Sequence, residues 1–251
     1  MKFLHKIQSE NQISYQKSQS DFLRSIYNEI YSFLKINKTI KKNRSIVLVG
    51  GKTSSVLFRD SSFRNLIFKH FNEFFLGDER CHKNSKYSNY SKLKEELFRF
   101  QKTKTYKFYK IFYPEKNIND LSYLYSHKIP SSVDLIILSV ADDGHIASLF
   151  PNSFDAKTKT RTILVKNSPK PPKLRISISP KVIMSAKKVI VIASGYKKGL
   201  ILAKAIRRPK KVQELPVRLT IGKTWILDKQ SSLIFKKYRA KKDQSTKIIL
   251  S

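Results

Sequence analysis

The stretch VDLIILSV, residues 133–140, reads as a strand buried on both faces, and ADDGH, residues 141–145, follows it directly. Two shorter apolar runs, SIVLV at residues 45–49 and VIVIA at residues 189–193, also stop at glycine-containing turns. None of these runs alternates polar and apolar residues, which a half-exposed antiparallel strand would need. The pattern therefore indicates a parallel sheet covered on both faces.

Helix-like stretches lie between the predicted strands. Residues 88–100 and 197–206 have helical apolar spacing. Within the first forty residues, Phe22, Ile26 and Ile30 have the same spacing. Short strands are also expected at residues 74–76 and 225–227. This alternation predicts an α/β fold, a mainly parallel sheet flanked by helices, Rossmann-like. We expect one domain over residues 1–251, with a basic C-terminal segment from about residue 229.

Composition limits the class of protein. The chain has 251 residues, one cysteine, and no apolar run long enough to span a membrane. A single Cys81 excludes an internal disulfide framework and a cysteine-based zinc cluster. The first residues lack the apolar core of a secretory signal. We therefore expect a soluble, cytoplasmic protein without a membrane partner, and a monomer.

The formal net charge is +33, and residues 151–251 carry +22 of it. Such an excess suggests a nucleic-acid partner, an anionic small substrate, or compositional drift in a genome rich in A and T. Lysine outnumbers arginine, and isoleucine and asparagine are plentiful, which favours drift. No nucleic-acid-binding module or basic face with interleaved aromatics is readable. We expect no specific nucleic-acid partner.

Ligands of parallel sheets bind at the carboxyl ends of the strands, so the residues after each predicted strand are the first candidates for a functional site. Gly50-Gly51-Lys52-Thr53 follows the first strand. Its peptide N–H groups and a following helix N-terminus could hold a phosphate, with Lys52 and Thr53 adding a charge and a hydroxyl. The spacing is not that of a P-loop. An ordinary tight turn is the alternative.

Asp78-Glu79-Arg80 follows the strand expected at residues 74–76. Arg80 could bind a phosphate through two N–H groups while Asp78 or Glu79 holds the guanidinium in place. The alternative is a structural ion pair at the end of a strand.

Asp143-Gly144-His145 is the segment with the clearest chemistry. A histidine with a carboxylate two residues earlier can act as a general base near neutral pH. Gly144 permits a backbone conformation that other residues resist. The alternative is that His145 caps a following helix.

These clusters resemble the 6-phosphogluconolactonase family, which shares an α/β fold with the glucosamine-6-phosphate deaminases. The matching segments run in family order: VGGKTS (residues 49–54), LGDERCHKNSKYSNY (76–90), LSVADDGHIASLFPN (138–152), PKPP (169–172) with RIS (175–177), SGYKK (194–198) and WILD (225–228). Val49, Ser139 and Ala141 depart from the family pattern. After DGHIA the deaminases continue F-N-E-P, whereas this chain has SLFP, which favours the lactonase.

The resemblance implies hydrolysis of 6-phospho-D-glucono-1,5-lactone to 6-phosphogluconate, with a phosphorylated sugar lactone as the small-molecule partner. It carries the phosphate-binding role onto Gly51, Lys52, Thr53, Arg80 and Lys198.

Arg175 is a further phosphate candidate, and Gly50 and Asp78 belong to the same substrate-binding set. His145 would be the general base that Asp143 orients, and peptide N–H groups near Gly144 would hold the oxyanion. No metal and no cofactor is expected. The alternatives are a degenerate phosphosugar-binding relative that has lost turnover and, further off, a basic nucleic-acid-binding protein.

Overall fold

The computed structural model describes residues 18–37, 43–101, 105–207, 211–238 and 248–250. Seven strands form one sheet in the order β10-β9-β8-β5-β1-β2-β4, and every neighbouring pair is parallel. The strands are β1 (Ser45–Leu48), β2 (Glu73–Leu76), β4 (Lys107–Tyr109), β5 (Leu135–Ser139), β8 (Lys188–Ala193), β9 (Thr224–Leu227) and β10 (Ile248–Leu250). The predicted parallel sheet is confirmed.

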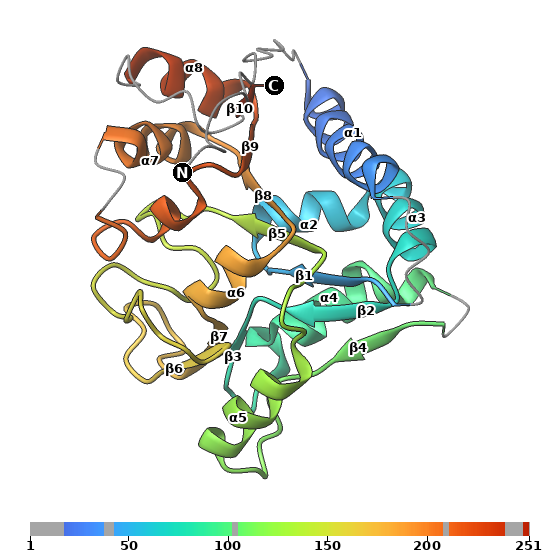
Figure 1. Cartoon of the computed structure of the whole chain (residues 1–251), viewed down its shortest axis with the longest axis vertical. Helices are drawn as coiled ribbons and strands as arrows, with labels where there is room; N and C mark the ends of the chain where they lie inside the picture. Colours follow the sequence, from blue (N-terminus) through green and yellow to red (C-terminus); the bar gives the residue numbers. More distant parts are fainter. Residues whose placement is uncertain (1–17, 38–42, 102–104, 208–210, 239–247, 251) are drawn as a thin grey trace, which may run out of the picture.

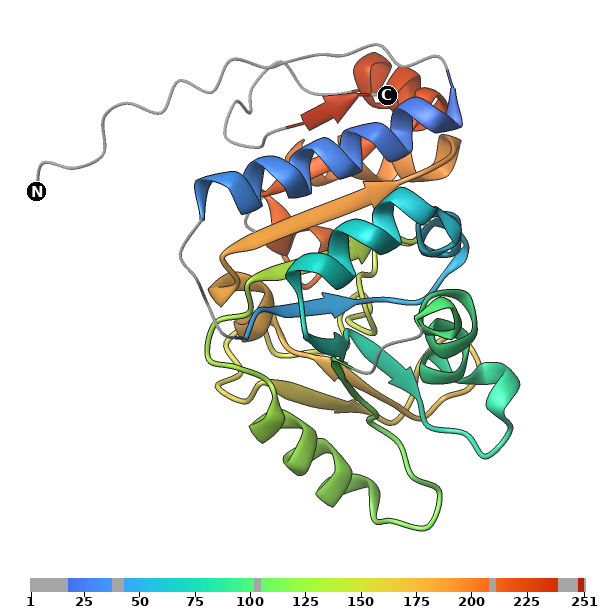
Figure 2. The same ribbon diagram turned by 90° about the vertical axis from the view of Figure 1, so that its right-hand side faces the viewer.

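Helices cover both faces of this sheet, as Figures 1 and 2 show. On one side lie α1 (Gln19–Ile36), α2 (Lys52–Arg59) and α3 (Ser61–His70), and on the other lies α7 (Tyr196–Arg207), packed against α8 (Lys229–Tyr238). The remaining helices are α4 (Asn89–Glu96), α5 (Ile118–Lys128) and α6 (Pro180–Ser185). Apolar side chains of α1, among them Phe22, Ile26 and Ile30, are buried at the spacing that the sequence predicted. Within the described ranges, no helix combines the length and apolar character of a membrane span.

A second sheet was not expected from the sequence. It has the order β3-β7-β6, with β3 (Asp78–Arg80), β6 (Thr162–Val165) and β7 (Arg175–Ile178), and both pairs are antiparallel. From the sequence, residues 78–80 were expected to be a polar cluster directly after a strand, and no strand was expected there. Instead, the chain leaves the large sheet at Gly77, whose N–H still donates to Leu48 O, and pairs at once with β7.

One predicted helix boundary also changes. The helix expected at residues 88–100 ends at Glu96, and a separate short 3₁₀ turn, η2 (Phe98–Phe100), follows it. Only part of the basic C-terminal segment is described, as α8 and β10, and residues 239–247 lie outside the described residues.

The order of the strands creates a switch point beside β1. The chain proceeds from β1 to β2 on one side and later returns to β5 on the other, so that Leu48 lies level with both Leu76 and Ile137. The segments that follow β1 and β5 therefore leave the sheet side by side. In open α/β sheets this is where ligands bind.

Candidate active site

A cavity of about 400 Å³ lies at the carboxyl ends of β1 and β5 and reaches the second sheet. It is large enough for a small ligand. Every candidate site residue from the sequence lines it except Asp143 and Gly144. The lining is Val49, Gly50, Gly51, Lys52, Thr53, Asp78, Arg80, Ser139, Val140, Ala141, Asp142, His145, Ala147, Lys170, Arg175 and Lys198.

The turn after β1 leads directly into α2. Gly51 is the N-cap of that helix, with φ of 124°, a conformation that side chains other than glycine rarely adopt. Thr53, in the first turn, is buried, and its Oγ1 accepts a hydrogen bond of 2.8 Å from Lys198 Nζ. Burial lowers the pKa of Lys198, although Asp142 and Asp228 partly oppose this. A helix N-terminus beside a half-buried ammonium suits an anion.

The two carboxylates of β3 do not hold Arg80. Asp78 accepts hydrogen bonds from Asn89 Nδ2 (3.0 Å) and Ser148 Oγ (2.7 Å). Glu79 accepts from the peptide N–H groups of Asn89 and Tyr90 and so caps α4. In the part of the chain that the structure describes, no ion pair joins Arg80 to either acid, so the alternative of a structural ion pair is wrong, as is the expectation that an acid holds the guanidinium. Phosphate binding by Arg80 itself stays a prediction.

Arg80 is instead held by Tyr87 O, which accepts from its Nη1 at 3.1 Å. Its Nε is buried without a hydrogen-bond partner, on a side chain that lines the cavity. Burial lowers the pKa of Arg175; Asp78 opposes this and the neighbouring Arg80 charge adds to it. Two neighbouring guanidinium groups at a cavity wall repel each other, and an anion bound between them would relieve this repulsion.

Arg175, a predicted phosphate contact, is largely committed to the protein. It is 3% exposed, and its Nε and Nη2 donate to Pro172 O (3.1 Å), Lys170 O (2.9 Å) and Pro171 O (3.3 Å). Its Nη1 lies 3.4 Å from Ser148 Oγ. The guanidinium therefore fixes the proline-rich turn between β6 and β7, and its expected phosphate role stays a prediction.

His145 and Asp143 form the expected pair. His145 Nδ1 lies 2.6 Å from Asp143 Oδ1, and the ring packs on Phe150 with centroids 4.5 Å apart. Burial alone would raise the pKa of Asp143, but the hydrogen bond and charge of His145, and the charge of Lys170, hold it well below its usual range. An ionised Asp143 fixes the proton on Nδ1 and leaves Nε2 as the acceptor.

No helix begins after His145, so the alternative that it caps one is wrong. Residues 140–149 instead form a tight irregular turn, with bridges of Ile146 to Val140 and to Leu149. Gly144 has φ of 81°, and a Cβ there would lie 2.2 Å from Leu215 Cδ1. Only glycine fits this position.

The expected oxyanion donors near Gly144 are already used. The Gly144 N–H donates to Ala141 O at 3.0 Å, and the His145 N–H donates to Asp143 Oδ1 at 3.3 Å. Gly144 also does not line the cavity. The N–H groups of Gly144 and His145 are thus used within the turn that positions His145, and the wider expectation of an oxyanion donor near Gly144 stays a prediction.

Lys170 is a cavity residue that sequence reasoning missed. Its Nζ lies 3.3 Å from Asp143 Oδ2, on the side of the carboxylate away from His145. The lysine belongs to the proline-rich turn, which the sequence analysis used only to recognise the family. Asp142 and Ser139 also line the cavity. Ser139 is the last residue of β5 and Asp142 lies shortly after that strand, and this position at a strand end was the signal that could have found them.

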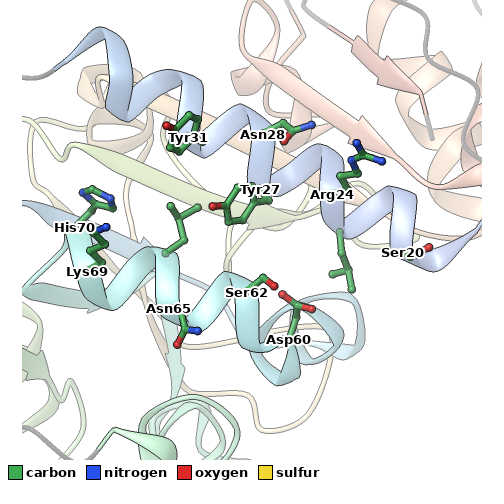
Figure 3. A pocket seen from close by; sticks show the side chains of 12 residues that line it. Ser20, Arg24, Tyr27, Asn28, Tyr31, Asp60, Ser62, Asn65, Lys69 and His70 are labelled. Atoms are coloured by element: carbon green, nitrogen blue, oxygen red, sulfur yellow. The ribbon is translucent and has the colours of Figure 1, made fainter.

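Three further features outside this cavity were considered as sites: Cys81, a metal-binding cluster and a second groove. Burial, with the charge of Glu79 adding to it, raises the pKa of the Cys81 thiol to about 12. Among the described residues, no three histidine, cysteine or acidic side chains are grouped to hold a metal ion. A groove of about 690 Å³ lies between α1 and α3 (Figure 3). Tyr27 and Tyr31 stack along it, and it lies apart from the strand ends.

Comparisons with known proteins identify the family of this chain. Residues 17–226 match the family described as glucosamine-6-phosphate isomerases/6-phosphogluconolactonase. A 6-phosphogluconolactonase of Borreliella burgdorferi is 31% identical over 216 residues, which cover 80% of this chain and 88% of the relative.

Two solved structures share the fold. A 6-phosphogluconolactonase from Trypanosoma brucei superposes with a TM-score of 0.73 at 22% identity, covering 89% of this chain and 98% of the other. A monomeric glucosamine-6-phosphate deaminase gives 0.70 at 14% identity, covering 88% and 99%. The chain belongs to the glucosamine-6-phosphate isomerase/6-phosphogluconolactonase family.

Proposed function

We propose that this chain is a hydrolase that opens 6-phospho-D-glucono-1,5-lactone with water to give 6-phospho-D-gluconate, in the oxidative pentose phosphate pathway. The observation that carries the proposal is a single cavity lined both by His145, whose Nδ1 contacts Asp143, and by a helix N-terminus with Thr53 and Lys198. The first suits general-base catalysis, and the second suits a phosphate.

The lactone is favoured over the amino sugar of the deaminases. Ser148, Leu149 and Phe150, which follow DGHIA, are all buried, and Ser148 Oγ donates to Asp78 at 2.7 Å. The segment that distinguishes the lactonase motif is thus part of the wall that supports the cavity. The Borreliella burgdorferi relative, which aligns over most of both chains, is also named a lactonase.

In the proposed reaction, the phosphate binds at Gly51, Lys52, Thr53, Arg80 and Lys198. The phosphate lies far from the reacting bond, and its binding energy positions the lactone carbonyl for attack.

His145 Nε2 accepts a proton from the attacking water, and Asp143 stabilises the imidazolium through Nδ1. The tetrahedral intermediate then collapses by breaking the bond between the carbonyl carbon and the ring oxygen, which takes the proton back from Nε2. Since both members of the pair are present and in contact, turnover is favoured over a degenerate sugar-binding role.

We further propose that residues 1–251 act as one domain, because both sheets contribute to the same cavity: Gly51 and His145 on one side, Asp78 and Arg175 on the other. A monomeric state and a cytoplasmic location stay predictions from the sequence.

A direct assay of lactone hydrolysis tests the function. The purified full chain should accelerate opening of 6-phosphogluconolactone above the spontaneous rate, and it should release no ammonia from glucosamine 6-phosphate. A lactone rate equal to the spontaneous one would refute the proposal.

A further inference from the structure

Opening a lactone by general-base attack places a negative charge on the carbonyl oxygen. Enzymes usually stabilise such an oxyanion with preorganised donors or cations. The two peptide N–H groups nearest the base, those of Gly144 and His145, are already bonded within their turn. Another donor at the cavity wall is therefore needed.

Five cationic side chains line the cavity, and their contacts distinguish them. Arg175 is committed to carbonyl oxygens of the proline-rich turn. Lys198 donates to Thr53 in the first turn of α2, and Lys52 is the first residue of that helix, so both belong to the phosphate end. Arg80 is anchored to Tyr87 O beyond β3. Lys170 is the cavity cation in contact with the residue that holds His145.

The backbone of Lys170 is fixed in place. Its carbonyl oxygen accepts from Arg175 Nη2 (2.9 Å) and from Ser168 Oγ (2.8 Å), and its N–H donates to Ser168 Oγ (3.2 Å). Because Arg175 is buried, the root of the lysine side chain is rigidly placed beside the dyad.

The ammonium, in contrast, can move. The Lys170 side chain is 49% exposed, and its contact with Asp143 Oδ2 is a single one of 3.3 Å. An ion pair of this exposure contributes little energy, so a stronger charge that forms nearby can attract the ammonium. A lysine offers three donors on a flexible stem, which suits this movement.

We propose that Lys170 is a catalytic residue, whose ammonium donates to the carbonyl oxygen of the lactone as that oxygen becomes negative. Water forms a bond to the carbonyl carbon and gives its proton to His145 Nε2. The carbonyl π electrons move onto the oxygen beside Lys170, and they return when the ring carbon–oxygen bond breaks. Lys170 keeps its proton throughout. This inference rests on the proposed function and assigns a group that its mechanism leaves open.

The test compares Lys170→Met with Lys173→Met on phosphorylated and unphosphorylated gluconolactone. Lys173 is an exposed lysine in the same loop outside the cavity, so its variant loses the same charge. Loss of one oxyanion donor typically costs about 10²- to 10³-fold in kcat. We expect that loss for Lys170→Met on both lactones, with KM within about threefold, whereas Lys173→Met should match wild type. Lys170→Arg should recover part of the rate, because it restores a cation.

The outcomes separate this inference from the function itself. An inactive wild type refutes the proposed lactonase. An active wild type with equal kcat for Lys170→Met and Lys173→Met overturns the role of Lys170 alone. A loss confined to the phosphorylated lactone and to KM would also overturn it, since Lys170 would then bind the phosphate. Thermal unfolding of each variant shows that it is folded.

Discussion

Replacing Asp143 by asparagine tests the centre of the proposed mechanism, because it removes a charge and preserves the size of the side chain. Asp143 Oδ1 accepts from His145 Nδ1 at 2.6 Å and from the His145 N–H at 3.3 Å, and Oδ2 contacts Lys170 at 3.3 Å. An asparagine can keep one of these acceptors but also introduces an NH₂ group beside Nδ1 or Lys170.

The magnitude follows from these contacts. A charge-assisted hydrogen bond contributes about 1.5–3 kcal/mol, which corresponds to roughly 10- to 150-fold if it acts in the transition state. If the asparagine NH₂ donates to Nδ1, the ring proton moves to Nε2, and the base can no longer accept from water. General-base assistance is worth about 10²- to 10⁴-fold, so we expect kcat for Asp143→Asn to fall by at least about 10².

The assay is steady-state hydrolysis of 6-phosphogluconolactone, corrected for the spontaneous reaction, with Asp155→Asn as the matched control. Asp155 undergoes the same chemical change outside the cavity, and among the contacts described its side chain accepts only from the nearby N–H of Lys157. Because the Asp143 side chain is 35% exposed, the free energy of unfolding should change by no more than about 1 kcal/mol. If kcat for Asp143→Asn stays within about threefold of the control, the dyad is not the catalytic unit.

Three further outcomes are expected. For His145→Ala, kcat should fall by about 10²- to 10⁴-fold with little change in substrate binding, and a rate near wild type in the same assay would rule His145 out as the base. Arg80→Met and Lys198→Met should each lower kcat/KM by roughly 10- to 100-fold on the phosphorylated lactone alone; equal losses on unphosphorylated gluconolactone would contradict the phosphate role. Since burial raises the pKa of Cys81 to about 12, its contribution to stability is complete below the ordinary pKa of 9.0 and declines as pH rises toward 12. Iodoacetamide at pH 8 should label Cys81 only after denaturation, and labelling of the native chain at the denatured rate would refute its burial.

The fold was largely predictable because its central strands are buried on both faces. Runs such as VDLIILSV cannot lie at a surface, and the helices between them have clear apolar spacing. The second sheet was not predictable by the same reasoning. Its strand β3 is three residues long and entirely charged, and its partner β7 lies almost a hundred residues later in the chain. Such a strand is defined by its pairing partner, and single-sequence periodicity contains no information about that partner.

The site was predictable to the extent that strand ends determine it. The rule that ligands bind beyond the carboxyl ends of parallel strands found Gly51, Arg80, His145 and Lys198 without a structure. It could not find Lys170, which reaches the cavity from the connection between two antiparallel strands.

The structure, unlike the sequence, shows which positive side chains of the cavity are already hydrogen-bonded to the protein. Their different burial is the physical reason for this difference. The donors of a guanidinium that is fully out of water must be satisfied by the protein. For that reason Arg175 donates its hydrogen bonds to the proline-rich turn. The Arg80 side chain lines the cavity and has fewer hydrogen bonds to the protein than Arg175, so it remains able to bind a ligand. A half-exposed ammonium such as Lys170 can exchange a weak contact for a stronger one during a reaction. The sequence presents all three as equal positive charges. Their different functions follow from which of them the fold has already paired.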